Sequence, residues 1–311
     1  MRTGLRRTST GLVLLMLALV AGCGEENEEA GSVQPQGIES RLTLGTKDFA
    51  EEFLLGELYK QALAAKSYDV TLRKNIGPTE VIDKELTSGA IDAYPEYLGV
   101  ALTVVAGQED AAGSAAETYR LAKSFYAGRG DALSEQTPFE NVDAIATTQF
   151  FAQRRGLLSV MDLRGLPSFT LGARPEFAAR FQGLKGLQEV YGLTNAEFKP
   201  IAIGAQYRAL DAGDVGAANV FTTDGQLASG DYKVLEDPKR LFGFQHVALV
   251  IDEDKLERLG GDRFMGVINA VNRRLTTSAM IEMNRAVAVD NQDEALVAER
   301  FLTEVGLLGA R

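Results

Sequence analysis

Cysteine, histidine and tryptophan are almost missing from this sequence of 311 residues. It contains one cysteine, Cys23, one histidine, His246, and no tryptophan. One cysteine excludes an intrachain disulfide, and a single residue of each kind excludes His/Cys metal clusters and Cys–His nucleophilic pairs within one chain. With 45% hydrophobic and 24% charged residues, the composition is otherwise that of a folded globular protein.

Positive charge is also scarce. Lysine and arginine total 32 against 43 aspartate and glutamate residues, which gives a net charge of −11. Sequence-independent binding to nucleic acid needs clustered cations that replace the counterions of the phosphates. The acidic composition therefore argues against a nucleic-acid partner.

Several motifs of enzymes are missing as well. The sequence has no Gly-x-Ser-x-Gly elbow, no Gly-x-x-x-x-Gly-Lys-Ser/Thr loop and no Gly-x-Gly-x-x-Gly after a predicted strand. We interpret His246 as structural, because no catalytic partner can be named. Asp252-Glu253-Asp254 could suggest a cation site, but we interpret it as a helix start, where carboxylates face the positive end of the dipole. We expect neither an enzyme nor a cofactor; an extracytoplasmic enzyme would need a pocket with a carboxylate pair or a metal.

The N-terminus carries a run of twelve apolar or small residues, 11–22, preceded by three arginines in residues 1–7. A helix that spans a bilayer needs about 20 apolar residues, so this shorter run is typical of an export signal. It ends in Val20-Ala21-Gly22-Cys23, which resembles a bacterial lipobox. We predict a signal peptide at 1–22 and a lipid on Cys23 that anchors the chain at the extracytoplasmic face of the cell membrane. An ordinary signal with an incidental cysteine is the alternative.

Residues 23–40 contain few large apolar side chains, and we predict a flexible tether there. Short apolar runs then alternate with amphipathic ones. The pattern predicts strands at 42–45, 68–75, 91–94, 142–148, 168–171, 198–203, 217–221, 232–235 and 247–251, and helices at 51–66, 79–87, after 95, at 115–126, 184–191, 207–212, 253–275, 279–288 and 292–306. This rhythm predicts two α/β lobes with mostly parallel sheets, and a ligand in the cleft between them.

Five segments carry a resemblance to a known family: Gly45-Thr-Lys-Asp-Phe-Ala-Glu51, Gly77-Pro-Thr-Glu-Val81, Asp92-Ala-Tyr-Pro-Glu-Tyr-Leu-Gly99, Phe181-Gln-Gly-Leu-Lys-Gly-Leu187 and Phe221-Thr-Thr-Asp-Gly225. In this order they resemble the OpuAC-like substrate-binding lipoproteins of osmoprotectant ABC importers, which take up glycine betaine, choline and carnitine. The resemblance implies the type II periplasmic-binding-protein fold, with two doubly wound lobes joined by a hinge. It places lobe 1 at 41–145 plus 243–311 and lobe 2 at 146–242. It also implies a monomeric receptor that delivers a quaternary ammonium ligand to permease and ATPase subunits.

The resemblance also suggests site residues. Lys47 and Arg180 match the family's cations for a ligand carboxylate, and Tyr97 matches a tyrosine of its aromatic box. Three positions depart from the family, which has tyrosine where this chain has Asp143, Phe221 and Phe244. A phenylalanine keeps the ring face, which attracts a trimethylammonium group by about 0.5–2 kcal/mol.

Asp143 is the departure with a chemical consequence. If it lines the pocket, it pairs with a cation, repels a ligand carboxylate and favours choline-like or bulkier betaine ligands over glycine betaine. The alternative is that it lies outside the pocket and makes a local turn bond. Tyr207 is a weaker candidate, with packing as its alternative role. A different solute on the same fold, such as ergothioneine or an amino acid, also stays open.

Overall fold

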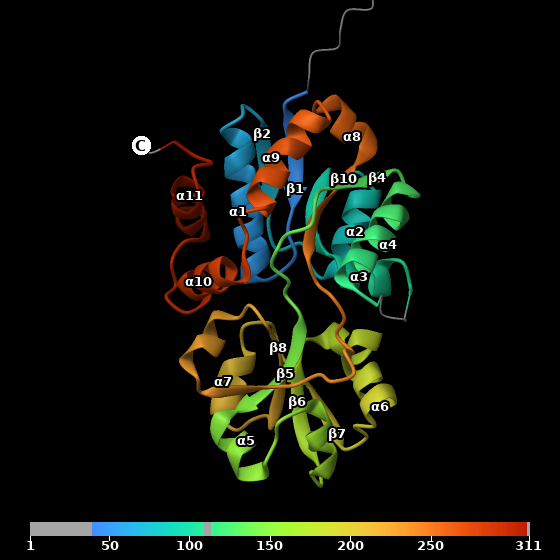
Figure 1. Ribbon diagram of the computed structural model, residues 1–311, viewed down its shortest axis with the longest axis vertical. Coiled ribbons are helices and arrows are strands. Elements are labelled where there is room, and N and C mark those ends of the chain that lie inside the picture. The colour runs from blue at the N-terminus through green and yellow to red at the C-terminus, as the bar shows by residue number, and fades with distance from the viewer. Residues whose placement is uncertain (1–38, 109–112, 310–311) are drawn as a thin grey trace, which may run out of the picture. The chain divides into compact units, whose positions relative to one another are not determined.

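The computed structural model describes residues 39–108 and 113–309, which belong to one structural unit, 38–311. The predicted signal peptide, Cys23 and almost all of the predicted tether lie outside the described residues. Within the described ranges, no helix combines the length and hydrophobicity needed to cross a bilayer. The unit contains two five-stranded sheets, each with its own helices (Figure 1). We call them, with the helices that pack on them, lobe 1 and lobe 2.

The sheet of lobe 1 has the order β2-β1-β3-β10-β4. Its strands are β1 (Arg41–Gly45), β2 (Asp69–Arg73), β3 (Ala93–Tyr97), β4 (Asp131–Leu133) and β10 (Val247–Asp252). β1 runs parallel to β2 and β3, whereas β10 runs antiparallel to both β3 and β4. All five residues of β3 are buried, as expected for a central strand with helices on both faces.

The helices of lobe 1 come from both ends of the chain. They are α1 (Ala50–Ala64), α2 (Thr79–Thr87), α3 (Leu98–Val100) continued by the π-helix η1 (Ala101–Val105), α4 (Ala115–Ala127), α8 (Glu253–Arg258), α9 (Asp262–Asn272), α10 (Thr277–Ala288) and α11 (Glu294–Glu304). The predicted helix 253–275 is thus two helices, because Gly260 and Gly261 take positive φ angles between them.

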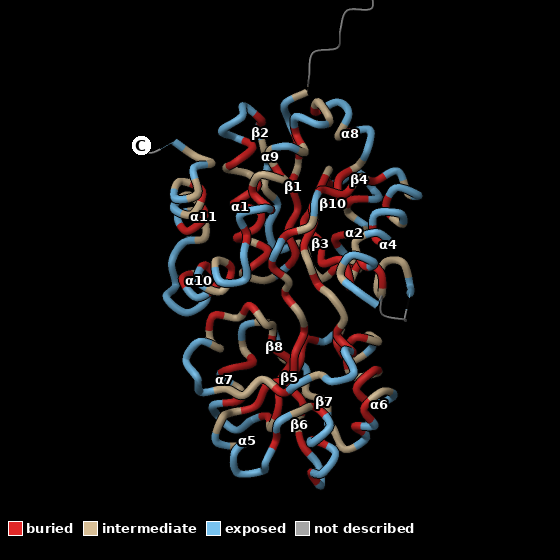
Figure 2. The backbone as a smooth tube through the Cα atoms, in the orientation of Figure 1, coloured by how far each residue is buried: buried red, intermediate tan, exposed pale blue. Residues whose placement is uncertain are grey.

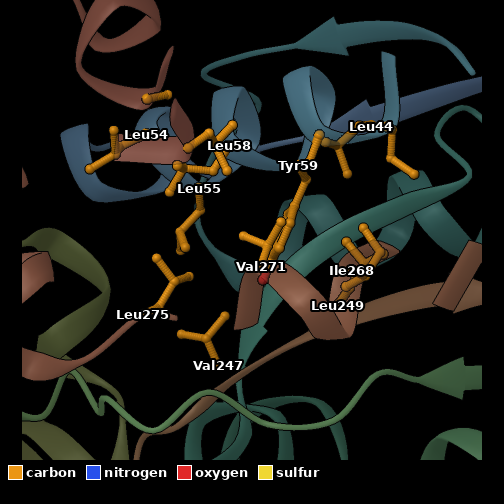
Figure 3. Packing of buried hydrophobic residues seen from close by; sticks show 14 of the residues in the cluster. Leu44, Leu54, Leu55, Leu58, Tyr59, Val247, Leu249, Ile268, Val271 and Leu275 are labelled. Carbon is orange, nitrogen blue, oxygen red and sulfur yellow. The ribbon is translucent and has the colours of Figure 1, made fainter. Parts of the chain in front are cut away.

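Side chains of β10 alternate between two hydrophobic cores, as the two-residue period of a strand requires. Val247 and Leu249 pack with Leu58 of α1 and Val271 of α9 on one face of the sheet (Figure 3). Val250 packs on the other face with residues of α2, β3 and α4. Figure 2 shows the central strands buried and the outer faces of the helices exposed.

The sheet of lobe 2 has the order β7-β6-β8-β5-β9. Its strands are β5 (Asp143–Thr148), β6 (Phe169–Ala173), β7 (Ala196–Pro200), β8 (Ala217–Phe221) and β9 (Tyr232–Leu235). Around them lie α5 (Gln149–Arg155), α6 (Gly186–Tyr191), α7 (Gln206–Asp211), the 3₁₀ helices η2 (Val160–Gly165), η3 (Pro175–Ala178) and η5 (Gly225–Ser229), and the π-helix η4 (Phe181–Lys185).

Each sheet contains one reversed strand, β10 in lobe 1 and β5 in lobe 2. These are the strands through which the chain enters a lobe from the other one, so they begin at the end of the sheet where the remaining strands finish. The prediction of two α/β lobes is confirmed. The strands of each sheet run parallel to one another, with β10 and β5 as the exceptions. The predicted boundary at 145 falls inside β5, because Asp143, Ala144 and Ile145 already pair with strands of lobe 2.

Candidate ligand-binding site

A hollow of about 430 Å³, including its part open to solvent, lies between the two lobes. Five of the six predicted binding residues line it: Lys47, Tyr97, Asp143, Arg180 and Phe221. At the sixth position the lining residue is Gln245, the neighbour of the predicted Phe244. A shift of one residue in matching this segment to the family accounts for this difference.

The strand ends explain why these residues meet. Tyr97 ends β3, Phe221 ends β8, and Lys47 follows β1 by two residues. Asp143 begins the reversed strand β5 and pairs directly with Phe221 across the sheet. The carboxyl ends of the parallel strands and the start of the reversed strand therefore face one hollow, as in other open α/β sheets.

Three aromatic rings from the two lobes come together at this hollow. The ring centroid of Phe49 lies 6.0 Å from that of Tyr97 and 5.6 Å from that of Phe221, with interplanar angles of 26° and 14°. Phe49 precedes the first residue of α1 in extended conformation. Phe49 lies in the segment 45–51 that carries the family resemblance, but its ring was not predicted at the site. An aromatic residue beside Lys47, just before a helix start, was the available signal.

Asp143 lines the hollow, which excludes the alternative of a local turn bond outside it. Its two oxygens accept hydrogen bonds from Nη1 and Nη2 of Arg174 at 2.6 and 2.9 Å. Asn219 adds a bond of 2.8 Å to the same carboxylate. The guanidinium of Arg174 lies 5.2 Å from the ring centroid of Phe221. The carboxylate that we expected to face a ligand cation is therefore already paired with a buried arginine that sequence reasoning missed.

The two predicted carboxylate-binding cations also have partners within the protein. Nζ of the buried Lys47 pairs with Glu96 and lies 4.6 Å from the ring centroid of Tyr97. Arg180 donates two hydrogen bonds to Glu80, of 3.1 Å from Nε and 2.8 Å from Nη2, and so joins lobe 2 to α2 of lobe 1. That Lys47 and Arg180 bind a ligand carboxylate stays a prediction.

Other residues weighed in the sequence have local roles. Nδ1 of His246 lies 3.0 Å from the carbonyl oxygen of Phe139. Asp252 accepts a hydrogen bond from the backbone of Lys255 and so caps α8, as its interpretation as a helix start implies. The buried Tyr207 donates to Asp224 at 2.8 Å and packs against another tyrosine ring. Within the described ranges, no group of three or more potential metal ligands gathers in one place.

Glu52 contacts the backbone of Lys47, one of the residues that line the hollow, and burial shifts its pKa. Its side chain is fully buried, Oε2 accepts the backbone N–H of Lys47 at 3.1 Å, and Oε1 has no hydrogen-bond partner among the described residues. Burial raises the pKa of Glu52 to about 8, although the charge of Lys47 acts in the opposite direction. Lys47 already pairs with Glu96, so the second carboxyl group stays protonated at neutral pH.

We expect this carboxyl group to make stability depend on pH. Between about pH 4.5 and 8, unfolding releases the proton of Glu52, so the free energy of unfolding contributed by this group falls as the pH rises, by at most about 1.4 kcal/mol per pH unit. Urea unfolding at pH 5, 6, 7 and 8 measures this slope. Glu52→Gln should reduce the slope between pH 6 and 8, and the exposed Glu304→Gln should leave it unchanged. Asp131 and Asp224, whose pKa burial raises to about 6, contribute mainly below that range. Equal slopes for Glu52→Gln and the unmodified chain would contradict the assignment.

Comparison with known proteins agrees with this geometry. Residues 40–304 match the family described as the substrate binding domain of ABC-type glycine betaine transport systems. A glycine-betaine-binding protein of Pseudomonas aeruginosa is 32% identical over 86% of this chain and 88% of its own length. An ergothioneine transport permease and binding protein of Helicobacter pylori is 25% identical, over 97% of this chain but 53% of its own length.

The same architecture occurs in solved structures. A crystal structure of a glycine betaine/carnitine/choline ABC transporter protein superposes with a TM-score of 0.69 at 23% identity, over 86% of this chain and 99% of that one. At this identity the likeness shows the fold, which is the two-lobed α/β fold of periplasmic binding proteins. Together with the family match over 40–304, these likenesses show that the chain belongs to the family of substrate-binding domains of ABC-type glycine betaine transport systems.

Proposed function

We propose that this chain is the extracytoplasmic receptor of an ABC importer and binds a quaternary ammonium solute such as glycine betaine or choline between its lobes. The observation that carries the proposal is the meeting of Tyr97, Phe49 and Phe221 at one interlobe hollow. A trimethylammonium group has no N–H to donate, so ring faces are its best partners in a protein.

The charges around the hollow suggest how a ligand carboxylate would be accommodated. Lys47 and Arg174 are buried together with their acidic partners, whereas Glu80 is 40% exposed beside Arg180. Exchange of Glu80 for a ligand carboxylate on Arg180 is therefore the least costly of the possible exchanges, since it uncovers no fully buried charge. A simple cation such as choline requires no exchange.

We further propose the cellular setting implied by the N-terminus. A lipid on Cys23 and the tether of residues 23–40 would hold a monomeric receptor near the permease and ATPase subunits. The lobes would move about the two crossings, which lie between β4 and β5 and between β9 and β10. Closure is favoured only by the difference in ligand affinity between the closed and open states.

Isothermal titration calorimetry with a matched panel tests the ligand class. We expect at least one of glycine betaine, choline and carnitine to bind, and glycine, which keeps the carboxylate but lacks the methyl groups, not to bind. Ligand-dependent thermal shifts give a second readout, because binding to the folded state raises apparent stability. Binding of an amino acid without any quaternary ammonium compound would overturn the proposal. If ergothioneine alone binds, the proposed ligand becomes ergothioneine, which the name of the Helicobacter pylori relative contains.

A further inference from the structure

Glu51, in the first turn of α1, collects hydrogen bonds from four separate segments of the chain. Oε1 accepts from the hydroxyl of Tyr97 at 2.7 Å and from Nδ2 of Asn141 at 2.8 Å. Oε2 accepts from the hydroxyl of Thr223 at 2.6 Å and from Nδ2 of Asn284 at 2.5 Å. All five side chains belong to buried residues.

These four donors span both lobes and one crossing between them. Tyr97 ends β3 of lobe 1, and Asn284 lies in α10. Asn141 lies in the segment that leads into β5, and Thr223 follows β8 of lobe 2 by two residues. Tyr97 and Thr223 matter most, because Tyr97 is one ring of the hollow and Thr223 is two residues from another, Phe221.

Three observations indicate that Glu51 organises its neighbours. Within the part of the chain that the structure describes, Oδ1 of Asn141 and Oδ1 of Asn284 are buried without a hydrogen-bond partner, so both amides direct their donor side to Glu51 although their acceptor side is left unsatisfied. Burial raises the pKa of Tyr97 well above its usual value near 10, so its hydroxyl stays protonated and donates. The start of α1 supplies favourable potential for the carboxylate.

The approach of lobe 2 to α10 adds to this arrangement. Asn284 also donates to the backbone carbonyl of Thr223 at 3.0 Å. Gly225 lies so close to the backbone of Arg285 that an added Cβ would stand 2.4 Å from its Cα. The loop that follows β8 is therefore held against α10 at the point where Glu51 reaches it.

We infer that Glu51 is the positioning residue of the binding site, which fixes the ring wall of lobe 2 relative to that of lobe 1 through the hydroxyls of Thr223 and Tyr97. The expected effect of Glu51 on ligand affinity rests on the proposed function. The effect of Glu51 on the arrangement of the lobes does not depend on the identity of the ligand. A hydrogen bond to a buried charged group contributes more than one between neutral groups, so loss of the Thr223 bond should be measurable.

Thr223→Val tests the inference, because valine keeps the shape of threonine and removes only the hydroxyl. We expect roughly tenfold weaker binding of choline and glycine betaine, mostly through faster dissociation. We also expect a larger radius of gyration of the ligand-free chain by small-angle X-ray scattering. Thr223→Ser keeps the hydroxyl, so it should retain the ligand affinity and the radius of gyration of the unmodified chain. Thr170→Val, in β6 of the same lobe, should change neither quantity.

A combination of variants separates positioning from folding. Glu51→Gln removes the negative charge and one of the two acceptor oxygens, so it should weaken binding at least as much as Thr223→Val, and Thr223→Val should add little to it, because both weaken the same contact. If Glu51→Gln fails to fold, the Thr223→Val and Thr223→Ser pair still decides. Unchanged affinity and unchanged scattering in Thr223→Val would overturn the inference. If the unmodified chain binds no quaternary ammonium compound, the proposed function fails, and the ligand-free scattering still tests Glu51.

Discussion

Replacing Phe221 by leucine is expected to lower the affinity for choline roughly tenfold, at unchanged affinity for the uncharged tert-butyl analogue of choline. Leucine keeps most of the apolar volume and removes the ring face. The ring of Phe221 stacks with Phe49 at 5.6 Å and ends the strand that faces the hollow, so its loss removes one wall of the site. Isothermal titration calorimetry with both ligands measures the effect.

A second ring enlarges the effect. If each face contributes independently, Phe49→Leu combined with Phe221→Leu should lower choline affinity roughly a hundredfold. Phe150→Leu is the matched control, because its side chain is 71% exposed in lobe 2, in α5. Equal losses for choline and its uncharged analogue would show that Phe221 supplies only apolar contact. Full choline affinity in the double variant would remove these rings from the binding site.

Replacing Arg174 by methionine is expected to lower the free energy of unfolding by about 3–5 kcal/mol, because it leaves the carboxylate of Asp143 buried without its cation. Both side chains are 6% exposed and share two hydrogen bonds. Urea unfolding followed by circular dichroism measures the change. Asp143→Asn in the same chain removes the second charge, so we expect it to recover most of the loss.

The single Asp143→Asn variant gives the binding counterpart of this result. It leaves the charge of Arg174 in the hollow, paired with Glu176 at 3.1 Å. The ratio of glycine betaine to choline affinity should therefore rise, because a ligand carboxylate gains a cation and a ligand cation loses a nearby anion. A loss below about 1 kcal/mol in Arg174→Met would show that Asp143 is well solvated. An unchanged affinity ratio in Asp143→Asn would show that its charge does not reach the ligand.

Short-range patterns were sufficient to predict much of this structure. The strands at 42–45 and 247–251 and the helix at 79–87 have strong periodicity and clear ends, and each occurs within a residue or two of its predicted bounds. The resemblance of the segments around Lys47 and Tyr97 to a known family likewise placed two residues that line the hollow. In both cases the information lies within about ten residues of sequence.

The parts that the sequence did not predict depend on pairing across the fold. Periodicity indicates a strand but not its direction, so it could not tell that β5 and β10 run opposite to their neighbours. Arg174 is 31 positions from Asp143, and only the arrangement of β5 and β6 in one sheet brings them together. Gln245 rather than Phe244 lines the hollow, which is a shift of one residue in matching this segment to the family.

Lys47, Arg174 and Arg180, the cations that line the hollow, are each paired with an acidic side chain, and this pairing determines how the site responds to dissolved salt. Lys47 and Arg174, with their partners, are almost completely shielded from solvent. Dissolved ions weaken interactions between charges mainly where they can come between them. The interactions within these two pairs therefore stay nearly the same in dilute and in concentrated salt, and the Arg180–Glu80 pair, whose glutamate is 40% exposed, is the part of the hollow that responds to the ionic strength of the medium.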